Sequence, residues 1–150
     1  MTRIGVLTSG GDAPGMNAAL RAVVRFGIDK DMEVWGVSRG YEGLLDGELE
    51  KMDRRSVGDI LQRGGTILKT ARSKRFMTDE GLERAARNLD TFRIDALVVI
   101  GGNGSYQGAL ELSRKGVNVI CIPGTIDNDL GYTDYTIGFD TAVNTTIEMV

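Results

Sequence analysis

The segment Ala96-Leu-Val-Val-Ile-Gly-Gly-Asn-Gly-Ser105 decides the fold of this chain. Its first half, 96–100, is a short apolar run, which is typical of a strand buried on both faces of a parallel sheet. The glycine-rich half allows a sharp turn, and a helical pattern begins near Ser105. A strand, a glycine turn and a helix in this order form the kind of junction at which open α/β sheets bind ligands.

The same kind of junction occurs twice more. Near the start, the apolar run 3–7 leads into Ser9-Gly-Gly-Asp-Ala-Pro-Gly15. Later, the run 117–122 leads into Pro123-Gly-Thr-Ile-Asp-Asn-Asp129, a loop with two aspartates two residues apart. Glycines let backbone N–H groups approach an anion, and the positive end of the following helix faces the same anion. Two close carboxylates can divide labour, one accepting a proton and the other handling a metal. The three junctions together predict a site that handles phosphate groups.

The composition limits the possible chemistry. With 150 residues the chain can form one domain with a substantial core. The net charge of −3 gives no basis for nucleic-acid binding. Histidine is absent, which excludes an imidazole base or metal ligand. The single cysteine, Cys121, excludes an intrachain disulfide and indicates a reducing cytoplasm, and no apolar run approaches the length needed to span a membrane.

Alternating periodicities predict an α/β fold: a parallel sheet with helices on both faces, in a Rossmann-like three-layer arrangement. The predicted strands are 3–7, 33–38, 96–100 and 117–122. The predicted helices are about 16–29, 79–92, 105–115 and one from 139 onward, with shorter helical turns at 41–46 and 56–62. We expect Phe26 and Trp35 in the core. No repeat or linker divides 1–150, so we expect one domain.

The last predicted helix has an apolar face but no stop signal. Phe139, Val143, Ile147 and Val150 share that face, and neither a glycine cap nor a basic last turn precedes the final residue. We therefore expect the chain to be truncated, as part of a longer subunit.

Four blocks of sequence resemble the signatures of the bacterial-type, ATP-dependent 6-phosphofructokinase family. They are Ile4–Ala19, Arg63–Ser73, Gly101–Gly108 and Pro123–Leu130, and the stretch Thr136–Asn144 continues the match. The resemblance covers essentially all 150 residues, and it implies the ATP-handling, N-terminal half of a subunit about twice as long. It further implies transfer of the ATP γ-phosphoryl group to the 1-hydroxyl of fructose 6-phosphate with Mg²⁺, by a homotetramer under allosteric control.

The resemblance also implies roles for individual residues. Asp127 would be the general base for the sugar hydroxyl, Thr125 and Ile126 would contact the substrate, and Arg72 would stabilise the developing charge, for which a planar guanidinium is suited. Asp129 would help to set the metal and phosphate environment. The residues expected to bind the nucleotide are Gly11, Arg72, Ser73, Gly102, Asn103, Gly104 and Ser105.

Two positions bear on the phosphoryl donor. The family's pyrophosphate-dependent branch typically has an acidic residue where this chain has Gly104, and a lysine where it has Gly124. The glycine at 104 leaves room for the rest of a nucleotide, so we predict ATP as the donor.

Asn103 departs from the family pattern, which usually has an aspartate associated with Mg²⁺ at this position. An amide oxygen can bind a hard cation but carries no charge. We therefore predict weaker metal binding by Asn103, with Asp129 or water taking part.

A second site follows from the resemblance. Arg21 and Arg25 lie four residues apart on one helix face, where spacing alone favours a solvated basic surface. The resemblance instead places them, with Arg54, in an effector pocket between subunits that binds ADP or phosphoenolpyruvate.

Two other functions stay open at this point. One is a non-catalytic module that binds a nucleotide or a sugar phosphate. Asn103 is consistent with it, and the resemblance implies that the arginines for the sugar phosphate lie outside these 150 residues. The isolated chain is accordingly expected to be poorly active. A kinase of the NAD or lipid class would also contain a glycine-rich loop, but the blocks around Gly11 and Asp127 argue against it.

Overall fold

The computed structural model describes all 150 residues and contains one six-stranded sheet. The strands are β1 (Arg3–Thr8), β2 (Glu33–Val37), β3 (Leu49–Met52), β4 (Ala96–Gly101), β5 (Val119–Thr125) and β6 (Ile137–Gly138). Their order across the sheet is β3-β2-β1-β4-β5-β6. All neighbouring strands run parallel except β3, which is antiparallel to β2.

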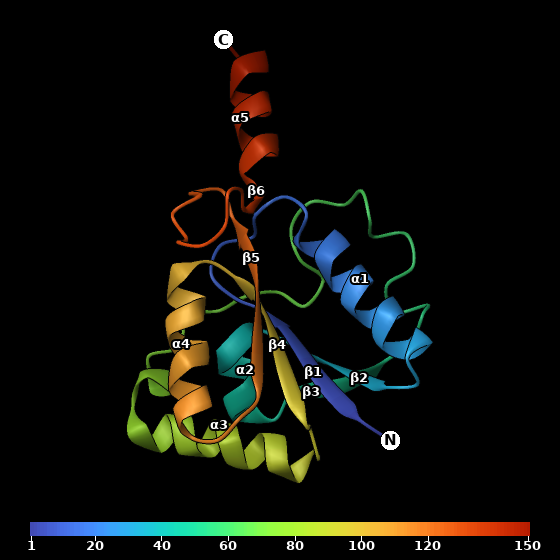
Figure 1. Cartoon of the computed structure of the whole chain (residues 1–150), viewed down its shortest axis with the longest axis vertical. Coiled ribbons are helices and arrows are strands. Elements are labelled where there is room, and N and C mark those ends of the chain that lie inside the picture. Colours follow the sequence, from blue (N-terminus) through green and yellow to red (C-terminus); the bar gives the residue numbers. More distant parts are fainter.

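Helices cover both faces of the sheet, as predicted (Figure 1). One face is covered by α1 (Met16–Asp29) and the other by α2 (Gly40–Asp46), α3 (Asp79–Thr91) and α4 (Asn103–Arg114). A short 3₁₀ turn, η1 (Arg75–Met77), precedes α3, and α5 (Phe139–Glu148) follows β6. The three-layer α/β architecture expected from the sequence is therefore confirmed.

The pleat of the central strands divides the core into two halves. In β1, Leu7 packs with α2, α3 and α4, whereas its neighbour Val6 packs with α1. Val99 and Val98 of β4 divide in the same way. Successive side chains of a strand point to opposite faces, so an unbroken apolar run is what a strand covered on both faces requires.

The structure differs from the sequence-based expectations in several places. Residues 56–62 form turns without a helix, and Phe26 is 64% exposed, so its expected place in the core is wrong. Trp35 does pack against the core, edge-on to Phe92. The strand β3 was not predicted, because an edge strand this short, with exposed Glu50 and Lys51, has no apolar run; edge charges of this kind also discourage pairing with other chains.

A long irregular segment, residues 53–78, crosses the carboxyl end of the sheet and is held there by buried polar side chains. The Asn17 amide donates to the carbonyls of Arg63 (3.1 Å) and Gly64 (3.3 Å), and its oxygen accepts from the backbone N–H of Ile67 (2.9 Å). The hydroxyl of Thr8, at the end of β1, donates to the Lys69 carbonyl at 3.1 Å. Segments this long without regular structure are usually functional in compact domains.

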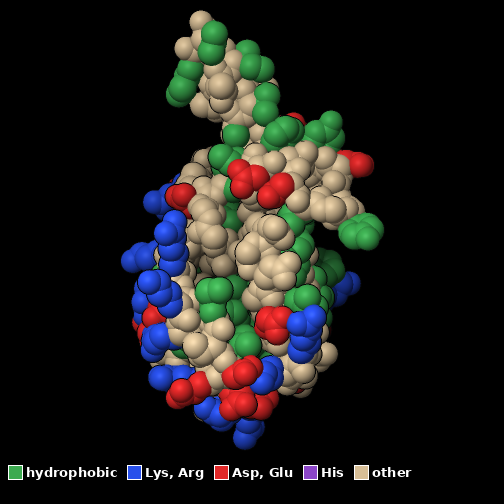
Figure 2. Space-filling view, turned by 90° about the vertical axis from the view of Figure 1, so that its left-hand side faces the viewer, with side chains coloured by type: hydrophobic (Ala, Val, Ile, Leu, Met, Phe, Trp, Pro, Cys, Tyr) green, Lys and Arg blue, Asp and Glu red, His purple; other side chains and the backbone are tan.

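At the other end of the chain, α5 stands clear of the rest of the molecule (Figures 1 and 2). None of its residues is buried, and Val143 and Ile147 on its predicted apolar face are exposed. No helix of the structure is long and apolar enough to cross a membrane.

Candidate functional site

The carboxyl ends of β1, β4 and β5 border a cavity of about 1300 Å³ lined by 26 residues. The chain leaves β1 for a helix on one face of the sheet and leaves β4 for a helix on the other. These two strands are neighbours, so the cavity lies at a topological switch point, the usual ligand site of open parallel sheets.

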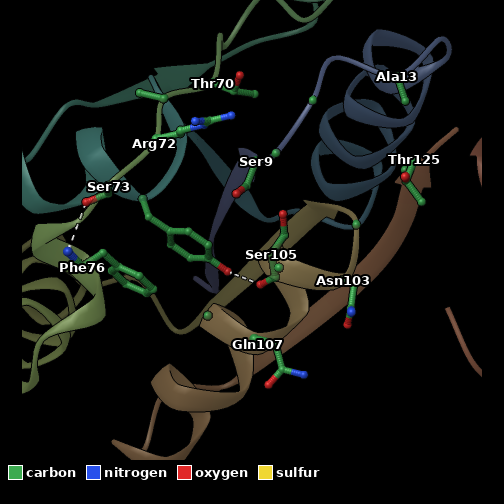
Figure 3. A pocket seen from close by; sticks show the side chains of 18 of the residues that line it. Ser9, Ala13, Thr70, Arg72, Ser73, Phe76, Asn103, Ser105, Gln107 and Thr125 are labelled. Carbon is green, nitrogen blue, oxygen red and sulfur yellow. Dashed lines mark hydrogen bonds between the residues drawn. The ribbon is translucent and has the colours of Figure 1, made fainter. Parts of the chain in front are cut away.

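The cavity brings together every residue that the sequence assigned to catalysis, nucleotide, substrate or metal. They are Gly11, Arg72, Ser73, Gly102, Asn103, Gly104, Ser105, Thr125, Ile126, Asp127 and Asp129. They come from four segments that are far apart in the chain. Figure 3 shows Arg72, Ser73, Asn103, Ser105 and Thr125 around one opening.

The N-terminus of α4 presents free hydrogen-bond donors to the cavity. The helix begins after Gly102 without a side-chain cap, so the first-turn N–H groups have no intrahelical partner. Ser105 in this turn is 4% exposed, and its hydroxyl oxygen has no hydrogen-bond partner. A Cβ on Gly101 would lie 2.4 Å from that oxygen, so only glycine fits there. Free N–H groups, a helix dipole and an unpartnered hydroxyl together suit an anion such as phosphate.

The turn after β1 forms the adjacent wall. The Ser9 N–H donates to the Ile100 carbonyl of β4 at 2.9 Å, which joins this turn to the end of β4. Gly10 has a φ of 83°, in the left-handed region that glycine adopts without strain. A Cβ at Gly11 would meet nothing within 4 Å, so its backbone borders open space.

The loop after β5 displays two carboxylates and is held by the residue between them. Asp127 and Asp129 are exposed and line the cavity, whereas Asn128, with a φ of 47°, bonds in another direction. Its amide donates to the Asp134 carbonyl (3.2 Å) and accepts from the Thr136 N–H (3.0 Å). The Thr136 hydroxyl donates to the Thr125 carbonyl at 2.6 Å. This pinned turn keeps both carboxylates at the cavity.

An aromatic pair completes the wall opposite. The rings of Tyr41 and Phe76 stack with centroids 4.0 Å apart and planes 12° apart (Figure 3). The Tyr41 hydroxyl donates to the Ser105 carbonyl at 2.6 Å, and burial raises the pKa of Tyr41 above its ordinary range. A Cβ on Gly108 would lie within 2.9 Å of both rings, so this glycine makes room for the pair.

Tyr41 is buried in the core and also lines the cavity. Phe76 and Gly108 were not predicted as part of the site, because a helical glycine and an isolated aromatic residue give no local signal. Cys121 is half-buried, and desolvation raises its pKa.

The three effector-site candidates lie outside this cavity. Arg21 donates to the Val57 carbonyl at 2.6 Å, Arg54 forms an ion pair with Asp29, and Arg25 is exposed. Arg21 and Arg54 are therefore tied to the contact between α1 and the segment after β3. Their role as an effector site stays a prediction.

No group of three or more acidic or cysteine side chains could enclose a metal ion by itself. Mg²⁺ at phosphoryl-transfer sites is usually held by one or two carboxylates together with substrate phosphates. Asp129 and the Asn103 amide, which share the cavity, fit a cation of that kind.

Comparison with known proteins gives consistent matches. The model of the phosphofructokinase family matches residues 3–150. The chain is 65% identical to an ATP-dependent 6-phosphofructokinase of Clostridium tetani over all 150 residues, which is 47% of that protein. The chain thus spans about half the length of the curated relatives it matches.

Solved structures agree with this match. A phosphofructokinase from Saccharomyces cerevisiae superposes with a TM-score of 0.92 at 42% identity, covering 99% of this chain and 23% of that one. A pyrophosphate-dependent phosphofructokinase from Marinobacter aquaeolei gives a TM-score of 0.80 at 25% identity, covering 99% of this chain and 41% of that one. Sequence, fold and family match agree, and the chain belongs to the phosphofructokinase family.

Proposed function

We propose that this chain forms the ATP-binding and catalytic half of an ATP-dependent 6-phosphofructokinase. The reaction is transfer of the ATP γ-phosphoryl group to the 1-hydroxyl of fructose 6-phosphate, giving fructose 1,6-bisphosphate. One observation carries the proposal: the uncapped N-terminus of α4 and the carboxylate of Asp127 border the same cavity. A phosphate donor and an acceptor alcohol can therefore meet there.

The residues support a division of roles. Asp127 accepts the proton of the sugar hydroxyl as its oxygen attacks phosphorus, while the bond to the leaving ADP breaks. Arg72 neutralises charge on the transferring group, and Thr125 and Ile126 contact the substrate. Phosphoryl transfer depends mainly on positioning and charge stabilisation, so one base is sufficient. A bound Mg²⁺, held by Asp129 and Asn103 together with the phosphates, would supply further charge neutralisation.

ATP, rather than pyrophosphate, is favoured as the donor. The relative at 65% identity is ATP-dependent, whereas the pyrophosphate-dependent structure is 25% identical. The space beside Gly104 is also open, since a Cβ there would meet nothing within 4 Å. An acidic side chain at this point would repel the inner phosphates of a nucleotide.

A coupled assay on the complete subunit tests the proposal. We expect fructose 1,6-bisphosphate formation that requires ATP and Mg²⁺ and is not supported by pyrophosphate. Activity with pyrophosphate alone would overturn the assignment of the donor. Tight ATP binding without any turnover would instead favour a non-catalytic binding module, the function suggested by Asn103.

The role of Asp127 predicts the effect of one substitution. Asp127→Asn keeps the size of the side chain but removes the base, so kcat should fall by roughly 10²–10⁴-fold. Binding of ATP, measured by calorimetry, should stay within about two-fold. Asp134→Asn is the matched control, because Asp134 lies in the same loop but does not line the cavity. Equal activity of the two variants would exclude Asp127 as the base.

We also propose that Arg21, Arg25 and Arg54 bind a phosphorylated effector, ADP or phosphoenolpyruvate, at a contact between subunits of a homotetramer. Support comes from their position. Arg21 and Arg25 lie on α1, Arg54 pairs with Asp29 at the end of α1, and all three are outside the cavity. Arg25→Ala should abolish the response of the complete enzyme to these effectors while leaving its rate without them unchanged. A preserved response would contradict the assignment.

A further inference from the structure

The cavity wall that contains Arg72 and Ser73 has no backbone support of its own. Residues 70–73 belong to no helix or strand, and their backbone groups make no hydrogen bond to other backbone groups. A segment of this kind is mobile unless side chains hold it. Side-chain contacts are therefore needed to fix Arg72 and Ser73, which face the proposed nucleotide site.

Glu42, on α2, makes the main contact. Its Oε1 accepts from Nε (3.0 Å) and Nη2 (2.5 Å) of Arg75, the first residue of η1. The same Nη2 also donates to Asp46 at 2.9 Å. One guanidinium is thus held by two carboxylates of a helix whose other face is buried in the core.

The Ser73 side chain is held to η1. Its oxygen accepts from the Phe76 N–H at 3.1 Å (Figure 3). The Ser73 hydroxyl and the Arg75 guanidinium both lower the pKa of Glu42, with Ser73 making the larger contribution. The second carboxylate oxygen of Glu42, Oε2, is buried and has no hydrogen-bond partner.

Asp46 is held in turn by Arg39, through its other carboxylate oxygen. Arg39 donates to Asp46 at 3.0 Å and to both oxygens of Glu48, at 2.9 and 2.6 Å. Isolated surface pairs contribute little, but bidentate arginines in a network contribute more. Within this network, only Arg75 belongs to the wall, while Arg39, Glu42, Asp46 and Glu48 come from the stretch between β2 and β3.

We propose that Glu42 is a positioning residue for the phosphoryl donor. It holds Arg75, the first residue of η1, through its guanidinium, and η1 in turn holds Ser73 through the hydrogen bond from the Phe76 N–H. Arg72 is thereby fixed between η1 and Lys69, whose carbonyl is held by Thr8 of β1. Glu42 does not line the cavity, so it acts through the wall and not on the ligand. The identity of the ligand as ATP rests on the proposed function.

The test compares Glu42→Gln with a matched control in the complete enzyme. Glu83→Gln removes the same charge from an exposed pair with Arg87 on α3, at 3.8 Å and outside the cavity. We expect Glu42→Gln to raise the KM for ATP about five-fold, the size of effect that a modest ion pair produces. The KM for fructose 6-phosphate should stay within two-fold, and Glu83→Gln should change neither constant.

A double-mutant cycle separates positioning from general loss of stability. Arg75→Gln should raise the KM for ATP as Glu42→Gln does, and the double variant should be no worse than either single one. Additive effects, an unchanged KM for ATP, or an equal rise of both KM values would overturn the proposal. Direct titration with ATP distinguishes a failure of this proposal from a failure of the proposed function. An inactive enzyme that binds ATP less tightly after Glu42→Gln would support positioning and contradict the kinase assignment, and failure to bind ATP at all would contradict both.

Discussion

At the scale of single residues, Asn103 is the position where this chain departs from the chemistry expected of its family. It is the first residue of α4 and is exposed at the cavity, where the helix dipole favours a negative charge. An amide at this place provides an oxygen ligand but no charge. A carboxylate would serve both the helix terminus and a bound cation.

Asn103→Asp should therefore increase turnover and lower the Mg²⁺ concentration needed for half-maximal rate. Initial rates across a Mg²⁺ titration, beside Asp134→Asn as a control for altered charge on the neighbouring loop, provide the measurement. An identical titration curve for Asn103→Asp and the parent would show that the amide is not a disadvantage.

The site illustrates which residues a sequence can reveal. Glycine turns and paired aspartates after apolar runs are local signals, and the predicted residues of this kind all line one cavity. The stack of Tyr41 on Phe76, and the ion pair of Glu42 with Arg75, join residues more than thirty positions apart. Such pairs have no signature in sequence spacing, because tertiary packing alone brings them together.

At the scale of elements, Gly81 allows α3 to pack directly on η1. A Cβ at Gly81 would lie 1.9 Å from the Arg75 carbonyl and 3.0 Å from the Phe76 Cα, both backbone atoms that cannot rotate away. The first turn of α3 is also capped there, since the Gly81 N–H donates to the Thr78 hydroxyl at 3.0 Å.

Gly81→Ala should lower the free energy of unfolding by about 2 kcal/mol, since overpacking costs about 1–3 kcal/mol and the better helix propensity of alanine offsets part of it. The melting temperature should fall by roughly 4–8 °C. Gly131→Ala, where an added Cβ meets nothing within 4 Å, should leave it unchanged. If both variants have the melting temperature of the parent, η1 can move away at no cost in free energy, and the close contact does not limit the residue at position 81.

Helices and strands with a strong period were predicted well, and those held by distant contacts were not. Residues 16–29 match α1, since one buried face with Met16, Leu20 and Val24 gives a clear helical repeat. The segment 53–78 has no such repeat, because its position depends on Asn17 and Thr8 from other elements. Sequence periodicity reveals an element that buries one face. It gives no signal for a segment that is held in place by polar side chains from other elements.

At the scale of the whole molecule, one charged network lies on the side of the sheet that α2, α3 and α4 cover. Hydrogen bonds from arginine lower the pKa of Glu48 (from Arg39) and of Asp46 (chiefly from Arg75) below their ordinary values of 4.5 and 3.8. The pKa of Glu42 is lowered likewise, first by Ser73 and then by Arg75. Histidine is absent from the chain, so no side chain of that type titrates near neutrality.

The sign of the resulting pH dependence follows from linkage. A carboxylate whose pKa is lower in the folded state than in the unfolded state stabilises the fold above the unfolded value, and this stabilisation is lost as the pH falls through the folded value. We expect the free energy of unfolding to stay level from pH 7 to about 5 and then to decline below the ordinary value of 4.5.

Glu48→Gln should remove part of that decline. The variant should be less stable than the parent at pH 7, because Arg39 loses its bidentate partner, and the two should converge as the pH falls through the lowered pKa of Glu48. Urea unfolding at pH 7, 5, 4 and 3 measures both curves, and Glu83→Gln controls for loss of an exposed carboxylate outside the network. Parallel curves for Glu48→Gln and the parent, with a constant difference down to pH 3, would show that protonation of Glu48 takes no part in acid unfolding, and that the network on this side of the sheet is held by its other members.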